Sequence, residues 1–189
     1  MRIKIPLVVL IVSVGFSAST FAMKIAGITM PDSFKAGNSS LVLNGAGVRT
    51  KLMLDIYAGG LYLQSKSSDG AAIINANEPM MIRLHIVSKL ISPKDFEVNT
   101  REGFSRSTGG NIAPIKNQIE QFIAIFKEGI SKNDVYDIMY DPAKGTCVYK
   151  NGTFKAASSG LEFKKALFGI WLGPTTMNPA LRKGMLVSN

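Results

Sequence analysis

The chain has 189 residues, of which 46% are hydrophobic, and it carries 22 lysine and arginine residues against 13 acidic ones. This length suits a single domain with a sizeable core, and the net charge of +9 comes from basic residues scattered singly and in pairs. Because there is no basic block and no interleaving of basic with aromatic residues, we expect no nucleic-acid partner. A solvated basic surface is the simplest interpretation, and such a surface can also attract anionic lipid headgroups weakly.

The first 22 residues show the three parts of an export signal. Two basic residues lie within the first four, residues 5–16 are mostly apolar, and Ala22 is a small residue suited to a cleavage site. We therefore predict a signal peptide over residues 1–22 and a periplasmic or secreted domain over residues 23–189, which has 189 − 22 = 167 residues. An uncleaved membrane anchor is the alternative, but the apolar part is shorter than the roughly 20 residues that a spanning helix needs.

The sequence holds one cysteine, Cys147, and one histidine, His85. An intramolecular disulfide therefore cannot form, and the sequence lacks the clusters of cysteine, histidine or carboxylate residues that metal sites need. It also lacks a phosphate-binding loop or a dinucleotide fingerprint, so we expect neither a metal nor a cofactor. Cys147 lies in a β-like run, and we interpret it as a small buried residue rather than a nucleophile.

The first half of the chain after the signal favours strands. A short strand is expected at residues 41–43, followed by a glycine-rich turn at 44–47 and a long strand region at 52–64. Within that region the pair Gly59-Gly60 indicates a bulge or a close approach by another part of the backbone. Residues 80–88 alternate between apolar and polar side chains, which is typical of a half-buried strand. A short helix is expected between them, at residues 71–77.

Two helices are expected in the middle of the chain. Ser92 as N-cap and Pro93 in the first helical position predict a helix that runs to about Arg106. A second helix begins at Pro114 and carries an apolar stripe at helical spacing, which predicts that one face packs on the core. The stripe consists of Ile115, Ile119, Phe122, Ile123, Phe126 and Ile130.

The last third returns to strands and ends in helices. The strands are expected at residues 135–140, 146–150 and 153–157, and the helices at 160–172 and from Pro179 onward. Asn151-Gly152 is a strong signal for a tight hairpin between the last two strands. The order of strands, helices, strands and helices predicts an α+β fold, with a mainly antiparallel sheet and helices on one face.

Two segments near the start of this domain have a recognisable pattern, together with one near its end. They read Leu-Asn-Gly-Ala-Gly-Val-Arg at 43–49, Ile-Tyr-Ala-Gly-Gly-Leu-Tyr-Leu at 56–63 and Ala-Leu-Phe-Gly-Ile-Trp-Leu-Gly at 166–173. With the helical middle, they resemble the chalcone isomerase family, and more closely its bacterial chalcone isomerase-like branch. The resemblance covers nearly all of residues 23–189 and implies an open-faced β-sandwich, with a ligand cleft between the sheet and a layer of helices.

The resemblance places Arg49 in that cleft. In the family's isomerases the corresponding arginine holds and polarises a phenolic substrate, and in its non-catalytic fatty-acid binders it pairs with the ligand carboxylate. Physical chemistry agrees, because a buried arginine needs a partner and its planar guanidinium matches a carboxylate with two parallel hydrogen bonds. We therefore predict that Arg49 contacts a ligand, with an ordinary surface-strand arginine as the alternative.

Other positions depart from the pattern of the isomerases. Tyr57 stands where they have a threonine, Phe96 where they have a tyrosine, Gly103 where they have an asparagine, and Ile170 where they have a hydroxyl residue. A cleft that loses these polar groups is better suited to hold an apolar tail than to stabilise a developing oxyanion. We therefore predict that Phe96 and Ile170 line the cleft, and we assign no catalytic residue.

Tyr57 is the candidate for a second hydrogen-bond donor to a ligand headgroup. Arg49 and Tyr57 are eight residues apart, which on one uninterrupted strand is roughly 26 Å. Their pairing therefore requires the chain to turn near residues 50–51. Tyr62 is the alternative donor.

Three hypotheses of function follow. The leading one is a non-catalytic protein that binds a fatty acid or a similar amphipathic carboxylate, with Arg49 at the polar end of an apolar cleft. The second is an isomerase, an intramolecular lyase acting on a chalcone-like unsaturated carbonyl compound. The third is an interaction module of the cell envelope with a vestigial cleft. The sequence predicts no oligomeric state.

Overall fold

The computed structural model describes residues 22–36 and 39–186. The predicted signal peptide therefore lies outside the described residues, apart from Ala22 at its end. Within the described part of the chain, no helix combines the length and the apolar character needed to cross a membrane.

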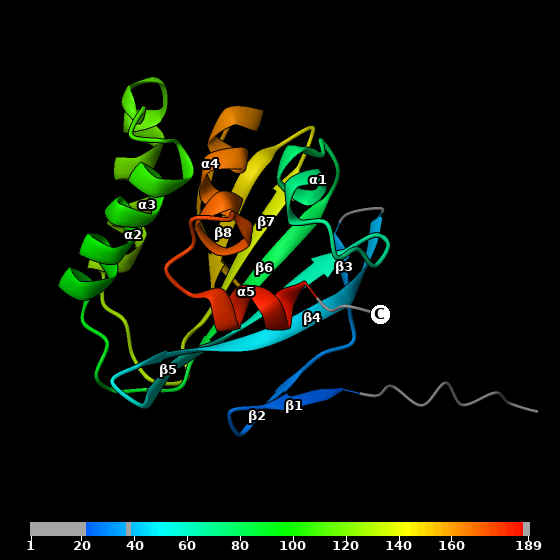
Figure 1. Cartoon of the computed structure of the whole chain (residues 1–189), viewed down its shortest axis with the longest axis vertical. Helices are drawn as coiled ribbons and strands as arrows, with labels where there is room; N and C mark the ends of the chain where they lie inside the picture. The colour runs from blue at the N-terminus through cyan, green and yellow to red at the C-terminus, as the bar shows by residue number, and fades with distance from the viewer. Residues whose placement is uncertain (1–21, 37–38, 187–189) are drawn as a thin grey trace, which may run out of the picture.

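A seven-stranded antiparallel sheet forms the centre of the fold, and each strand pairs with its neighbours in the sequence (Figure 1). Its strands are β3 (Ser33–Ala36), β4 (Ser39–Lys51), β5 (Leu54–Leu63), β6 (Met80–Ile86), β7 (Val135–Asp141), β8 (Gly145–Lys150) and β9 (Thr153–Ser158). A separate hairpin joins β1 (Met23–Ile25) to β2 (Ile28–Met30). The sequence did not predict β1, β2 or β3.

The helices gather on one side of this sheet, as Figure 1 shows. They are α1 (Gly70–Asn75), α2 (Pro93–Ser107), α3 (Lys116–Lys127), α4 (Leu161–Leu172) and α5 (Pro179–Met185), with a 3-10 turn η1 (Ala113–Ile115) before α3. The predicted α+β class, with an antiparallel sheet backed by helices, is confirmed.

Local signals explain where the helices begin. Ser92 accepts a hydrogen bond from the backbone N–H of Asp95 at 3.0 Å, and Pro93 opens α2, so the predicted cap is confirmed. In α3 the apolar stripe faces inward, with Phe122, Ile123 and Phe126 at most 2% exposed. The helix itself begins later than Pro114, because the residues around this proline form the 3-10 turn first.

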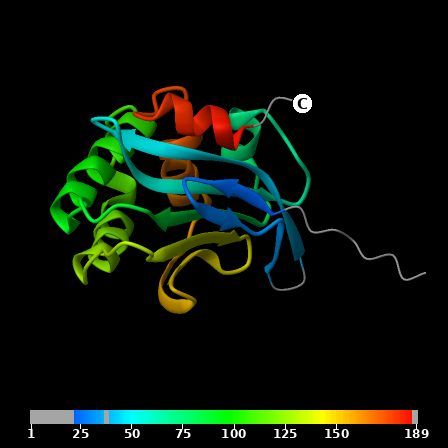
Figure 2. The ribbon, with the colours of Figure 1, turned by 90° about the horizontal axis from the view of Figure 1, so that it is seen from below.

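The larger of two apolar cores lies between the sheet and the helices. Leu84, Tyr136 and Phe168 are completely buried there. The smaller core lies on the other face of the sheet, where Met30, Tyr62 and other side chains are covered by the β1–β2 hairpin and β3. Figure 2 shows this hairpin from below, in front of the sheet. The N-terminal segment therefore closes part of the sheet face that the helices leave open.

The prediction of a turn at residues 44–47 is wrong, because these residues lie in the middle of β4. The glycine there serves close packing instead. A Cβ atom on Gly47 would lie 2.8 Å from the backbone oxygen of Leu181, so α5 can rest directly on the strand only if this residue is glycine. On β5 a Cβ atom at Gly59 would lie 2.5 Å from the side chain of Met185, so the close neighbour of Gly59 is a side chain of α5, and the predicted bulge or backbone approach is not found there.

Candidate functional site

Arg49 and Tyr57 are direct cross-strand partners in the pairing of β4 with β5. A two-residue turn at Leu52-Met53 brings the strands back together, slightly later than the predicted position. An irregularity of register follows, since Arg49 pairs with Tyr57 whereas Thr50 pairs with Asp55. The turn thus removes the 26 Å separation expected for one uninterrupted strand.

The guanidinium of Arg49 is half-buried and is held by uncharged groups. Its Nη2 donates a hydrogen bond to Oδ1 of Asn99 on α2 at 3.0 Å, and its Cζ lies 5.8 Å from the ring centroid of Tyr57. The amide of Asn99 is itself fixed, because its Nδ2 donates to the backbone oxygen of Asp95. No ion pair involves Arg49 within the described residues. A guanidinium has five N–H donors, so this side chain retains donors for an anion.

The hydroxyl of Tyr57 is oriented by Trp171. The indole Nε1 of Trp171 donates a hydrogen bond to the Tyr57 oxygen at 3.0 Å, and both residues are at most 3% exposed. An indole N–H is only a donor, so the Tyr57 oxygen is the acceptor in this bond, and the hydroxyl hydrogen of Tyr57 remains available for a second hydrogen bond. Tyr57 can therefore donate a hydrogen bond in the direction of an acceptor beside Arg49.

Apolar side chains surround these polar groups. Phe96 and Ile170 are 6% and 8% exposed, and they line the same small hollow as Arg49, Tyr57 and Met177. Phe96 also stacks on Phe126, with ring centroids 3.8 Å apart. The structure thus brings together four of the five predicted site residues.

The hollow is almost filled by these side chains. It has a volume of about 20 Å³, and a second hollow of about 30 Å³ lies on the other side of Arg49, lined partly by Ile56, Leu90 and Ile91. Each is comparable to the space of about one water molecule. The residues of the predicted cleft are therefore assembled around Arg49 in a closed arrangement.

Gly103 and Ile170 explain one departure from the isomerase pattern. A Cβ atom on Gly103 of α2 would lie 2.8 Å from Cγ2 of Ile170 on α4. The two positions therefore suit each other, since the missing side chain on one helix makes room for the branched side chain on the other. This contact closes the seam between α2 and α4 with apolar groups in place of hydrogen-bonding ones.

Tyr62 is not brought to this site. Its side chain lies in the smaller core on the opposite face of the sheet, where its hydroxyl donates to the backbone oxygen of Pro31 at 2.9 Å. Burial raises the pKa of Tyr62, so the phenol stays protonated. Its role in the structure is to fix the segment between β2 and β3 against the sheet.

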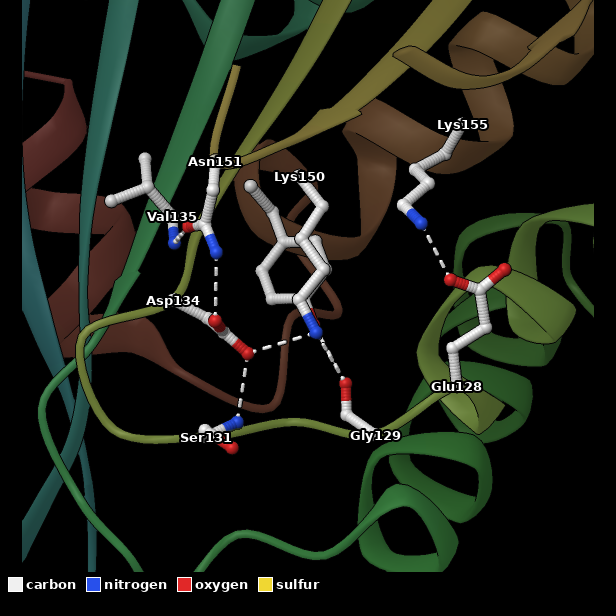
Figure 3. Close-up of polar contacts among 9 residues, drawn as sticks. Glu128, Gly129, Ser131, Asp134, Val135, Lys150, Asn151 and Lys155 are labelled. Atoms are coloured by element: carbon white, nitrogen blue, oxygen red, sulfur yellow. Dashed lines mark hydrogen bonds and ion pairs between the residues drawn. The ribbon is translucent and has the colours of Figure 1, made fainter. Parts of the chain in front are cut away.

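A second group of charges, at the start of β7 and the end of β8, forms a closed structural network (Figure 3). Asp134 pairs with Lys150 at 3.0 Å and accepts hydrogen bonds from Asn151 and from the backbone of Ser131. Burial opposes ionisation, but the hydrogen bonds from Asn151, Lys150 and Ser131 hold the pKa of Asp134 below its usual value. Lys150 also donates to the backbone oxygen of Gly129 at 2.7 Å. These bonds fasten the loop between α3 and β7.

A much larger hollow lies elsewhere, beside α4. It has a volume of about 700 Å³ and is bounded by α1, the end of α2 and the residues after α4. Its cationic side chains are already paired, Arg106 with Glu102 at 2.6 Å and Lys165 with Glu162 at 2.8 Å. Size alone favours this groove, but the buried donors and the incompletely used cation are found around Arg49.

Sequence reasoning missed Asn99, which holds the guanidinium of Arg49. The available signal was its position on α2, three residues after Phe96, because residues three apart share a helix face. Arg83 lies on the other face of the sheet, where its guanidinium donates two hydrogen bonds of 2.6 and 2.7 Å to the carboxylate of Asp137.

The fold and this site define a class: an antiparallel sheet, backed by helices on one face, with a half-buried arginine at the sheet–helix boundary. The sequence comparison identifies this class, because the sequence model of the chalcone isomerase-like family matches residues 22–187. The chain therefore belongs to the chalcone isomerase-like family. No curated protein matches it significantly.

Among solved structures, the chain is similar to the crystal structure of a fatty-acid binding protein of Arabidopsis thaliana. The TM-score is 0.69 and the sequence identity 18%, and the alignment covers 89% of this chain and 96% of the plant protein. A likeness at this identity establishes the shared fold.

Proposed function

We propose that this protein binds a fatty acid, or a similar amphipathic carboxylate, without transforming it. Arg49 and Tyr57 would hold the carboxylate, and the apolar side chains around them would hold the tail. The observation that carries the proposal is the state of Arg49: a half-buried cation whose one hydrogen bond within the described residues goes to the neutral Asn99. The fold shared with a protein that binds fatty acids supports the choice of ligand.

The headgroup geometry fits a carboxylate. Such a group has two oxygens that accept several hydrogen bonds, and a guanidinium offers a planar pair of N–H donors. Tyr57 adds an O–H donor whose oxygen is already fixed by Trp171. Neither residue lies on a long loop that would have to become ordered, because Arg49 and Tyr57 face each other on two paired strands. This preorganisation lowers the entropic cost of binding.

The tail requires space that the closed arrangement does not contain. Pockets for ligands of this size are typically about 300–1,000 Å³, far above the roughly 20 and 30 Å³ beside Arg49. We propose that the seam between α2 and α4 opens at Gly103 and Ile170 when a ligand enters. That contact consists of apolar groups, whereas about one turn further along the hydroxyl of Ser107 on α2 donates to the backbone oxygen of Ala166 on α4 at 2.8 Å and keeps the helices joined there.

The same residues argue against the isomerase as the leading function. Phe96, Gly103 and Ile170 contribute no hydrogen-bond donor at the positions where the isomerase pattern has polar residues, whereas a developing oxyanion needs donors aimed at it. Arg49 and Tyr57 alone would bind an anionic headgroup in the ground state, which is sufficient for a binding protein.

Native mass spectrometry of the protein purified from its own cells tests the proposal. We expect a bound acyl chain in the wild type and none in Arg49→Gln. Arg106→Gln is the matched control, because Arg106 lines the large groove on α4 and is exposed. If Arg49→Gln retains the acyl chain and Arg106→Gln loses it, the ligand binds in that groove and not beside Arg49. Turnover of a chalcone by the purified protein would instead favour the isomerase, and failure to bind any added fatty acid would favour an interaction module.

We also propose that the protein works outside the cytoplasm after removal of residues 1–22, because these residues have the pattern of an export signal. Intact-mass measurement of the protein from the periplasmic fraction tests this. A chain that begins at Met23 is expected, and a full-length chain retained in the membrane fraction would contradict cleavage.

A further inference from the structure

The turn between β4 and β5 places two large apolar side chains in water. Leu52 is 85% exposed and Met53 is 96% exposed, and Leu54, the first residue of β5, is 49% exposed. Leu90, in the loop between β6 and α2, is 66% exposed. We call these four residues the apolar tip. They are half of the large hydrophobic residues found exposed in the described parts of the chain, which number eight.

The four residues lie at the same end of the sheet. The backbone N–H groups of Val87 and Ser88 both donate to the oxygen of Ile56, so the loop that carries Leu90 runs beside the start of β5. Lys51 and Leu90 also line the same small hollow. Figure 1 shows the end of the β4–β5 hairpin and the chain that leads into α2 at the same end of the sheet.

The backbone of this turn makes its sequence unusual. Leu52 and Met53 have φ angles of +51° and +62°, in the left-handed region that a two-residue hairpin turn requires and that favours asparagine and glycine. The hairpin between β8 and β9 has the same length and uses Asn151 and Gly152, at +51° and +79°. The fold therefore does not need a leucine and a methionine at the turn, and both its backbone and its exposure disfavour them.

The surroundings of the tip are basic. Lys51, Lys89 and Lys94 are exposed around it. The nearby carboxylates are Asp55, which accepts a hydrogen bond from Thr50 at 3.1 Å, and Asp95, which pairs with Lys51 at 3.8 Å and with Ser92. Because Lys51 and Asp95 pair with each other, Lys89 and Lys94 against Asp55 leave the surroundings of the apolar side chains with a net positive charge, which we call the positive collar. Apolar groups surrounded by lysines are the combination that binds an anionic bilayer surface.

We propose that the apolar tip docks on an anionic phospholipid bilayer, with Leu52, Met53, Leu54 and Leu90 inserted at the headgroup boundary and the three lysines against the lipid phosphates. The docked tip lies beside the hollow that contains Arg49, because Lys51 and Leu90 line that hollow together with Arg49. Docking does not depend on the proposed ligand, although it would place the ligand site next to a source of amphipathic carboxylates.

Flotation of the full chain with vesicles of phosphatidylglycerol and phosphatidylcholine tests the proposal. We expect binding that falls at least about tenfold in Leu52→Asn/Met53→Gly, because the apolar side chains are removed. This variant converts the turn to the sequence found at residues 151–152, so it keeps the fold. Every variant has the same N-terminal segment, so a difference between variants reports on the tip alone. Phe154→Ser is the control, because Phe154 is 54% exposed on β9 and outside the tip.

The charge of the collar is tested separately. Lys89→Gln/Lys94→Gln should weaken binding to the anionic vesicles by roughly tenfold and leave binding to pure phosphatidylcholine unchanged. Equal flotation of the wild type and Leu52→Asn/Met53→Gly would overturn the proposal. A second result would also overturn it. If the wild type does not float, but sedimentation shows a dimer that Leu52→Asn/Met53→Gly abolishes, then the apolar tip binds a second copy of the chain.

Discussion

Arg49 and Tyr57 face each other across β4 and β5, although eight residues separate them in the sequence. The tight turn at residues 52–53 makes them neighbours, and Trp171 on α4 fixes the hydroxyl of Tyr57 from the helix side. The cation and the phenol therefore belong to one rigid piece of the sheet. The apolar contact of Gly103 on α2 with Ile170 on α4, by contrast, is the part that we propose to move.

The hydrogen bond from Trp171 to Tyr57 predicts a measurable coupling energy. Tyr57→Phe removes the acceptor and leaves a buried indole N–H without a partner, which should destabilise the protein by about 1–3 kcal/mol. In a double-mutant cycle measured by urea unfolding, Tyr57→Phe should cost about 1 kcal/mol less in the Trp171→Phe background than in the wild type. Strictly additive effects would show that the two residues do not share a hydrogen bond in solution.

Gly103 is predicted to be intolerant of a side chain. Gly103→Ala places a Cβ atom 2.8 Å from Cγ2 of Ile170, a stiff β-branched side chain, and should lower the free energy of unfolding by about 1–2 kcal/mol despite the better helix propensity of alanine. In the background of Ile170→Ala the same substitution should be neutral or stabilising, because the obstructing methyl group is gone. An equal cost in both backgrounds would place the strain elsewhere.

Lys164 predicts a particular dependence of stability on pH. It is completely buried, and its Nζ donates to the backbone oxygens of Ile73, Ile74 and Ala76 at 2.7–2.9 Å, at the end of α1. Burial lowers the pKa of Lys164 from 10.5 to about 8. Because the folded state releases this proton at a lower pH than the unfolded state, the contribution to stability rises as the pH increases from about 8 towards 10.5.

The measurement compares the wild type with Lys164→Met, so that the contributions of all other titrating groups, which are common to both proteins, cancel. Between pH 8 and pH 9 the difference in unfolding free energy should change by about 1 kcal/mol in favour of the wild type. A difference that stays constant up to pH 10 would mean that the ammonium keeps its proton, held by the three carbonyl oxygens.

The turn at Leu52-Met53 predicts a gain in stability. Leu52→Asn/Met53→Gly relieves two residues with left-handed backbone conformation and removes exposed apolar surface, so it should raise the free energy of unfolding by about 1 kcal/mol. Thermal unfolding checks this. A lower melting temperature would show that Leu52 or Met53 makes a stabilising contact within the protein.

Sequence patterns predicted the helices and most strands correctly because their signals are local. The N-cap at Ser92, the apolar stripe of α3 and the Asn151-Gly152 turn each act within a few residues. The error at residues 44–47 has a tertiary cause, because glycine in a strand and glycine in a turn look alike until α5 is seen packed against it. Strands β1 to β3 are short and cover only a small core, so their pattern was too weak to detect.

In the candidate site, too, some residues could be predicted from sequence patterns, and others depend on tertiary packing. Arg49 was singled out by its glycine-rich motif, and Phe96 and Ile170 by their positions in the family pattern. Asn99 and the hydrogen bond from Trp171 depend on how α2 and α4 pack on the sheet, which no local pattern encodes. Tyr62, only five residues from Tyr57 on the same strand, points to the opposite face because side chains alternate along a strand.

The most direct test of the central claim compares a long-chain fatty acid with the alcohol of the same chain length, in titrations with the wild type and with Arg49→Gln. If Arg49 binds the carboxylate, the wild type should prefer the acid over the alcohol by roughly tenfold or more, as expected for a hydrogen-bonded charge pair. Arg49→Gln should lose this preference while still binding the apolar tail. An equal preference for the acid in both proteins would contradict the account.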